Sequence, residues 1–233
     1  MAPVFDHQPI TQIFPNVYWV QGSIKMGLGM RMNRNMIILK DGPDLILINP
    51  VRLKDSELEK LDALGLVKRI FRLGDFHGLD DEFYLNRYQC EFWAQEGQTT
   101  YPNPKATHVI KSEVVCPHPF AKFFVFETAL YPEAAIYLSD SKLLITTDSV
   151  QFHQNWKYFT WFTKFAFKLL GFKLGVNIGP PWLKRVTPKG QSLKSDFDRL
   201  LSLDFENLIA AHGALLKLNA KEKLKKEVNL VFK

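Results

Sequence analysis

The 233-residue sequence predicts an α+β protein whose strands and helices are arranged in layers. Short apolar or alternating segments of strand length interchange with segments of helical periodicity, which favours a layered α/β protein over an all-β barrel. The content of 46% hydrophobic and 23% charged residues is typical of a folded globular chain. Three predicted strands are also followed, directly or after a short turn, by residues that can bind a metal ion. One domain of residues 1–233 is expected for this length.

Nine segments are predicted as strands because they are short, rich in β-branched and aromatic residues, and bounded by turn residues. They lie at residues 16–24, 35–40, 44–49, 67–73, 90–94, 122–128, 134–138, 142–147 and 208–211. The second and third form a hairpin around Asp41-Gly42-Pro43, a typical turn sequence. Residues 97–105 are rich in polar residues, glycine and proline, and predict a loop that could border a substrate cleft.

Five segments show helical periodicity or helix start and stop signals. They lie at residues 56–64, 82–88, 156–170, about 192–201 and 219–231. Asp55 is expected to cap the first helix, and Gly65 ends it. Ser192 or Ser195 can cap the fourth, and Gly179-Pro180-Pro181-Trp182 predicts a rigid turn before it.

Residues able to bind a metal gather where three predicted strands end. After residues 67–73, the turn at residues 74–81 reads Gly-Asp-Phe-His-Gly-Leu-Asp-Asp and holds one imidazole and three carboxylates. Residues 142–147 run directly into Asp148, and residues 208–211 into His212-Gly213. Imidazole and carboxylate together suit zinc, iron or manganese. Taken alone, the acids of the first turn are more typical of a helix start.

This pattern of strand ends resembles the metallo-β-lactamase superfamily, whose metal ligands lie on loops at the ends of strands. The family signature is His-x-His-x-Asp-His after an early strand, then a lone His, a strand ending in Asp and a strand ending in His-Gly. The resemblance covers about residues 16–216 and implies a four-layer αββα sandwich of metallo-β-lactamase type.

The resemblance implies five metal ligands: Asp75, His77, Asp80, Asp148 and His212. In the preferred register, Asp75 and His77 take the places of the first two histidines of the motif, and Asp80 that of the last. Leu79 then stands where the family has the Asp that positions the hydrolytic water. A register shifted by two places Asp81 on that Asp, with His77 and Leu79 on the first two histidines. Asp80 and Asp81 are therefore the candidate catalytic acids.

The lone middle histidine of the family has no direct counterpart in this chain. Tyr131 lies near its expected place, just before the strand at residues 134–138. His118 lies upstream, and His153 follows the third motif closely enough to enter the same site. Asn49 ends an early strand where many family members have Asp, so it could orient site residues by hydrogen bonds. These four residues are additional candidates for the site.

The implied activity is metal-dependent hydrolysis of an ester, lactone, amide or phosphodiester in a small molecule bound in a cleft at the strand ends. Two imidazoles and three carboxylates form a harder ligand set than a His-rich dizinc site. One or two divalent ions are expected, and iron or manganese suits this ligand set as well as zinc does. The competing interpretation is a binding protein that kept the fold and lost catalysis, because two motif histidines are replaced.

A helical insertion at about residues 150–190 differs from the rest of the chain. Residues 149–195 hold eight Lys or Arg, no Asp or Glu, and three of the five Trp. On a helix at residues 156–170, a polar stripe (Lys157, Thr160, Lys164, Lys168) would border a broad apolar face (Phe159, Phe162, Phe165, Ala166, Leu169, Leu170). Such a face packs against the sandwich or a second subunit, or it contacts a membrane surface or covers a lipid-like substrate. Residues 156–172 are the candidate membrane-surface or homodimer contact.

The net charge of +6 is unevenly distributed along the chain. Residues 149–195 carry +8, the segment 217–233 with its Lys-rich helix carries +4, and the remainder carries −6. The candidate site is therefore locally acidic, and nucleic acid is not expected as a partner. Two cysteines are too few for a disulfide framework. No signal peptide or transmembrane span is recognisable, so we expect a cytoplasmic protein, peripheral to a membrane at most.

Overall fold

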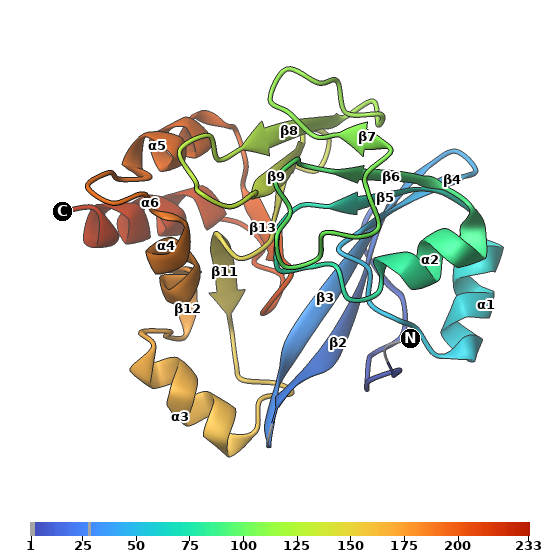
Figure 1. Ribbon diagram of the computed structural model, residues 1–233, viewed down its shortest axis with the longest axis horizontal. Coiled ribbons are helices and arrows are strands. Elements are labelled where there is room, and N and C mark those ends of the chain that lie inside the picture. The colour runs from blue at the N-terminus through green and yellow to red at the C-terminus, as the bar shows by residue number, and fades with distance from the viewer. Residues whose placement is uncertain (1–2, 28) are drawn as a thin grey trace.

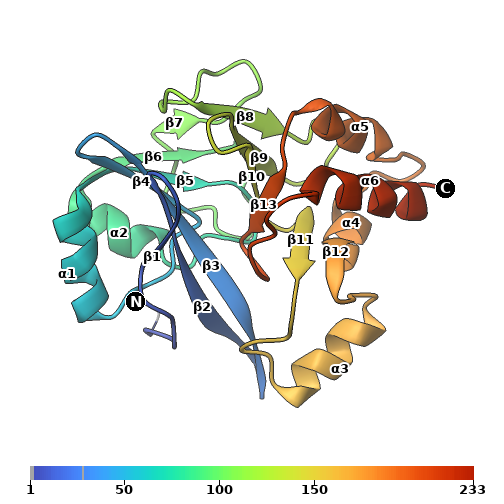
Figure 2. The same ribbon diagram turned by 180° about the vertical axis from the view of Figure 1, so that it is seen from behind.

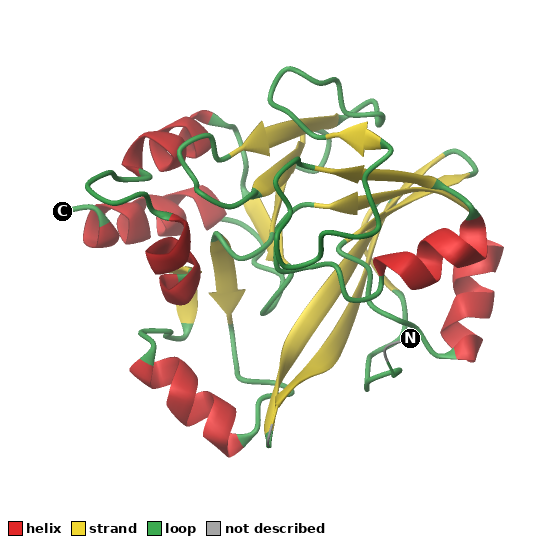
Figure 3. Cartoon of the chain, viewed as in Figure 1, coloured by secondary structure: helices red, strands yellow, loops and turns green. Residues whose placement is uncertain are grey.

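The computed structural model describes residues 3–27 and 29–233, which form two stacked β-sheets with helices on both outer faces (Figures 1 and 3). The first sheet contains β1 (Thr11–Phe14), β2 (Val17–Gly27), β3 (Met30–Asp41), β4 (Asp44–Ile48), β5 (Leu66–Arg72), β6 (Glu91–Ala94) and β7 (His108–Val109), ordered as in the chain. Strands β1 to β4 pair antiparallel, and β4 to β7 pair parallel.

The second sheet has the order β13-β10-β9-β8. Its strands are β8 (Ala121–Val125), β9 (Ala134–Leu138), β10 (Leu143–Thr146) and β13 (Asn207–Ala210), and a separate ribbon pairs β11 (Val150–His153) with β12 (Gly175–Ile178). The helices are α1 (Asp55–Leu64), α2 (Asp81–Tyr88), α3 (Trp161–Leu169), α4 (Pro180–Val186), α5 (Lys194–Ser202) and α6 (Ala220–Val231).

Three apolar clusters define the four layers. The first lies between the sheets, where Ile37 and Phe71 of one sheet meet Ile136 of the other. A second packs α1 and α2 on the outer face of the first sheet, and a third packs α4, α5 and α6 on the outer face of the second. Burial of these apolar faces is the main stabilising contribution to such a sandwich. The predicted αββα architecture is confirmed.

Most elements agree with the sequence prediction to within a few residues. Outside the insertion, β1 was not predicted, and β3 begins at Met30 rather than at residue 35. The insertion differs more. Helix α3 begins at Trp161 rather than at residue 156, because the Thr160 side chain accepts a hydrogen bond from the Thr163 backbone N–H and caps the helix there. The predicted rigid turn at residues 179–182 is instead the start of α4, with Pro180 and Pro181 in its first turn. Proline is well tolerated there because the first helical N–H groups have no intrahelical partner.

No helix within residues 3–27 and 29–233 is both long and apolar enough to cross a lipid bilayer.

The ends of β5, β10 and β13 converge on one edge of the sandwich. Strands β10 and β13 are parallel neighbours, with Thr146 opposite Ala210, so the residues that follow them emerge side by side. The turn after β5 reaches the same edge, because Gly74 forms an isolated bridge with Glu133 just before β9. This convergence brings the three predicted motifs together.

Candidate metal centre

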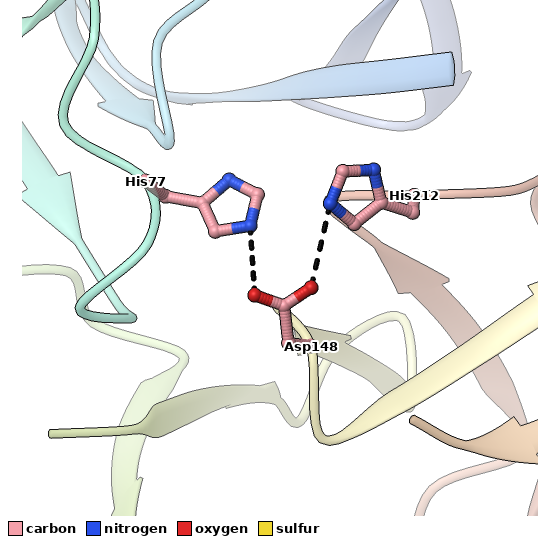
Figure 4. Close-up of side chains that lie close together, drawn as sticks. All are labelled: His77, Asp148 and His212. Carbon is pink, nitrogen blue, oxygen red and sulfur yellow. Dashed lines mark hydrogen bonds and ion pairs between the residues drawn. The ribbon is translucent and has the colours of Figure 1, made fainter. Parts of the chain in front are cut away.

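His77, Asp148 and His212 form a compact group at this edge (Figure 4). One ligand atom from each lies within 4.8 Å of the others. The Asp148 carboxylate lies between the two imidazoles, with Oδ2 3.1 Å from His77 Nε2 and Oδ1 3.4 Å from His212 Nε2. The three side chains therefore face a common point, as the ligands of a single metal ion must.

The surroundings of His212 fix its tautomer. Its Nδ1–H donates to the backbone carbonyl of Asn33, 2.7 Å away, so the Nε2 lone pair of the neutral ring faces Asp148. The Asn33 side chain also accepts a hydrogen bond from the Gly213 backbone N–H. Any side chain at Gly213 would collide with the backbone carbonyl of Phe152. A histidine held through Nδ1 with Nε2 free is the usual arrangement of a metal ligand.

The electrostatics of the group favour the protonation states that bind a metal. Burial lowers the pKa of His77, despite the opposing effect of the adjacent Asp148 carboxylate, and keeps the ring neutral. The pKa of Asp148 is lowered far below its ordinary value, because the two imidazoles beside it outweigh the effect of burial. Metal ligands must be unprotonated. Both shifts keep His77 and Asp148 unprotonated at a lower pH than their ordinary pKa values would allow.

Buried polar side chains hold Asp148 in place. One oxygen of Glu133 accepts hydrogen bonds from the backbone N–H groups of Asp148 and Ser149. Burial and the nearby Asp148 charge raise the pKa of Glu133 well above its ordinary value. Gln151 donates from its amide to Asp148 Oδ1, 3.2 Å away.

The group opens into a cavity of about 420 Å³. Its walls are mainly apolar and include Met32, Phe76, Leu79, Phe167, Phe172 and Trp182. Two arginines, Arg34 and Arg185, also line it. The Arg185 guanidinium lies over the Phe76 ring, 4.5 Å from its centroid, and over the Tyr131 ring. A cavity of this size and lining is typical of a small-molecule site.

Asp75, predicted as a ligand, does not join the group. Its carboxylate accepts hydrogen bonds from the backbone N–H groups and the hydroxyls of Thr99 and Thr100. These bonds outweigh the effect of burial and lower the pKa of Asp75. The carboxylate therefore anchors the loop of residues 97–105, which contributes Tyr101 to the cavity wall.

Asp80, predicted as a ligand and a catalytic acid, and Asp81, predicted as a catalytic acid, also lie outside the group. Asp80 forms a buried ion pair with Arg34, 2.6 Å long, and also accepts the backbone N–H of Arg52. Asp81 forms a fully buried ion pair with Arg72, also 2.6 Å long. Each carboxylate thus forms an ion pair with an arginine. None of the three acids in the turn at residues 74–81 belongs to the group, whichever register of the motif is used.

Of the four additional candidates, Asn49 and Tyr131 lie near the group without entering it, and His118 lies away from it. Asn49 is buried; its side chain accepts the Leu73 N–H and donates to the Thr147 hydroxyl, so it ties together two of the converging strand ends. Tyr131 packs behind the cavity wall, with its ring 6.4 Å from that of Phe76. His118 lines a separate hollow beside β8.

His153, the fourth candidate, lies beneath α3 in an aromatic cluster. Its ring stacks on Trp156 and contacts Phe159 and Phe172. Its Nε2 lies 3.0 Å from the Gln151 side-chain oxygen, so Gln151 connects it to Asp148. Burial, reinforced by the nearby His212, lowers the pKa of His153 to about 4.

This shift predicts a pH dependence of stability. Between pH 6.5 and about 4, the unfolded chain protonates His153 and the folded chain does not, so the free energy of unfolding falls as the pH falls through this window. The full loss is on the order of 3 kcal/mol. His153→Phe keeps the aromatic packing and removes the titration. Denaturant unfolding at several pH values should give a shallower acid slope for the variant; equal slopes would contradict this assignment.

Sequence reasoning missed several residues that build the site. Asn33, Arg34, Glu133 and Gln151 are buried, and each touches the group or lines its cavity. These residues could have been noticed in the sequence because polar residues lie within or beside largely apolar strands. Arg34, for example, directly precedes the apolar part of β3. Buried polar residues in such places usually have specific partners.

No protein-family model matches this sequence, and no curated protein matches it.

Solved structures do match over nearly the whole chain. VMB-1 (crystal structure at pH 5.5) aligns with a TM-score of 0.69 and 12% identity, over 99% of this chain and 98% of that one. The metallo-β-lactamase FIM-1 from Pseudomonas aeruginosa, in its mono-zinc form, aligns with a TM-score of 0.67 and 11% identity, over 96% of each chain. A metallo-β-lactamase from Pontibacter korlensis aligns with a TM-score of 0.67 and 14% identity, over 96% of this chain and 98% of that one. The protein therefore has the metallo-β-lactamase fold.

Proposed function

We propose that this protein is a metal-dependent hydrolase that cleaves an ester, lactone, amide or phosphodiester in a largely apolar small molecule. The observation that carries the proposal is the Asp148 carboxylate set between His77 and His212 at the mouth of an apolar cavity. Three protein ligands leave a coordination position open, which is the usual difference between a catalytic and a structural zinc site.

The residues present fit one divalent ion, with His77, Asp148 and His212 as its ligands. Because His212 Nδ1 donates to the Asn33 carbonyl, the neutral ring would present its Nε2 lone pair to a cation placed between it and Asp148. Zinc suits this ligand set, and iron or manganese also accept it. A bound divalent ion supplies a Lewis acid and lowers the pKa of coordinated water toward neutrality. The mono-zinc form of FIM-1 supports a one-ion site on this fold.

The chain's own residues would bind and orient the substrate. The apolar walls exclude water from its apolar part, and Arg185 presents a cation to an anionic group at the cavity wall. Asp148 is the one carboxylate that lines the cavity within the described part of the chain. Leu79, which takes the place of the family's water-positioning Asp in the preferred register, also lines the cavity and is apolar. The presence of Leu79 in place of a second carboxylate favours a second candidate function, a protein of the same fold that binds metal and ligand without turnover.

The test is a hydrolysis screen of metal-loaded protein against ester, lactone, amide and phosphodiester substrates with apolar groups. We expect turnover that His212→Ala abolishes and that His108→Ala, a histidine substitution at an exposed position outside the group, leaves unchanged. Metal-loaded protein that turns over no member of the panel would overturn the hydrolase proposal and support the binding protein. Turnover that survives in His212→Ala would overturn the proposed site.

A further inference from the structure

Helix α3 has apolar side chains on two opposite sides. One side packs inward through Thr163 and Phe167, and Phe167 joins the cluster of Met32, Phe159 and Phe172. The helix also contacts β3, where the Arg31 backbone N–H donates to the Thr163 hydroxyl. These contacts fix the orientation of the helix on the body of the protein.

The opposite side of α3 is exposed and equally apolar. Trp161, Phe162, Phe165 and Leu169 lie within one arc of the helix, because their spacing of one, three and four residues places them together. Trp161 is 67% exposed, Phe165 59% and Leu169 73%. Leu170 and Leu174 extend this surface beyond the helix. We call these six residues the α3 face. An aromatic cluster of this kind on a surface marks an interaction site.

The α3 face lies at one end of the molecule. Figures 1 and 2 show α3 beside the tip of the β2–β3 hairpin, apart from the other helices, in both views. The Thr160 hydroxyl holds the start of α3 beside this hairpin tip by donating a hydrogen bond to the backbone carbonyl of Gly29. Such a projecting end can approach a flat surface without obstruction by the rest of the fold.

Positive charge borders the α3 face. Lys164 and Lys168 lie next to the apolar arc, and Lys157 precedes the helix; all three are exposed. Residues 149–195 contain no acid that would neutralise them locally. Aromatic and aliphatic side chains beside lysines are the pattern of helices that lie in the interface of an anionic membrane.

We propose that the α3 face docks this protein on the surface of an anionic lipid bilayer. A second copy of the chain is the competing occupant, but two identical faces would bring their lysines together, and like charges oppose such a contact. An anionic bilayer meets both the apolar arc and the lysines. Docking is independent of the proposed hydrolase function, because it requires neither the metal group nor catalysis.

The α3 face reaches the wall of the cavity at one residue, Leu170. Phe167, on the inward side of α3, and Met26, near the end of β2, line the same wall. Docking would therefore bring the cavity close to the lipid, and an apolar substrate would be drawn from the bilayer. This consequence rests on the proposed hydrolase function, whereas docking does not.

The test is co-sedimentation of the full chain with vesicles of phosphatidylcholine, with and without phosphatidylserine. We expect binding to the phosphatidylserine vesicles that weakens with salt, and a shift of Trp161 emission to shorter wavelength. Phe165→Ser with Leu169→Ser should weaken binding roughly 100-fold. Lys164→Gln with Lys168→Gln should weaken it roughly 30-fold. All four positions are exposed, so circular dichroism should show an intact fold.

Helix α6 supplies the matched controls, because it is also rich in lysine and exposes Leu230. Lys225→Gln with Lys226→Gln, and Leu230→Ser, should leave vesicle binding unchanged. Equal weakening by the α6 variants would show general adsorption of a basic protein and overturn the proposal. Absence of binding at low salt would also overturn it. A dimer in sedimentation velocity that Phe165→Ser with Leu169→Ser dissociates, without vesicle binding, would assign the α3 face to a second copy.

Discussion

Asp81→Ala is expected to lower the free energy of unfolding by about 3–5 kcal/mol, the cost of leaving a buried charge without its partner. Asp81 and Arg72 are both fully buried, and the Arg72 Nε lies 2.6 Å from the carboxylate. Arg72 also donates to the Tyr101 carbonyl and lies over the Phe92 and Tyr101 rings, and none of these contacts neutralises its charge. Denaturant unfolding of wild type and variant measures the loss.

Asp62→Ala is the matched control for this prediction. Asp62 forms an ion pair of similar length, 2.7 Å, with Arg87, but both side chains are about 40% exposed. Exposed pairs contribute about 0–1 kcal/mol, so this variant should remain close to wild type. Replacing both buried partners, as in Arg72→Met with Asp81→Leu, should recover much of the stability lost in Asp81→Ala. If the two alanine variants lose equal stability, the buried pair does not have the structural role assigned to it.

Asp148→Asn is expected to weaken zinc binding by at least about 100-fold. The substitution removes the one negative charge of the group, and loss of a ligand costs more than the 10–100-fold typical of its supporting partners. His77 and His212 remain but cannot by themselves complete a site. Competition with a chromophoric chelator measures the affinity. Asp140→Asn, at an exposed loop position away from the group, should bind zinc as wild type does, and an Asp148→Asn affinity within about threefold of it would contradict the ligand assignment.

The layers of the fold could be predicted because their signals are local. Strand alternation, the Asp41-Gly42-Pro43 turn and the Gly65 helix end each depend on a few neighbouring residues. His77, Asp148 and His212 could be identified for a related reason, since each directly follows a strand, or a short turn after one. Parallel strand ends such as those of β10 and β13 then meet at one edge.

The roles of the acids near His77 could not be predicted, because their partners are distant in the sequence. Asp75 is held by Thr99 and Thr100, and Asp80 by Arg34, at separations of 24 to 46 residues. Aligning the sequence with the family motif compares only positions along the chain, and it does not show that a buried arginine binds one of the acids. Where the acids of each register lie could therefore be learned only from the tertiary contacts.

Helix α3 shows a second limit of sequence reasoning. Its periodicity predicted one broad apolar face and left open whether that face is buried or exposed. The helix begins only at Trp161, so its buried side is formed by Thr163 and Phe167, while Phe162, Phe165 and Leu169 face outward. Which side packs inward depends on the contact with β3, and the pattern of α3 alone does not contain that information.

The central claim is that His77, Asp148 and His212, and not Asp75, hold a metal ion. Elemental analysis of untagged protein purified without chelator tests it most directly, with wild type, His77→Ala, His212→Ala and Asp75→Asn prepared in parallel and supplied with zinc, iron and manganese. Stoichiometric metal in wild type and Asp75→Asn, lost in both histidine variants, is the expected result. Metal retained by His212→Ala, or no metal in wild type after supplementation, would contradict the account.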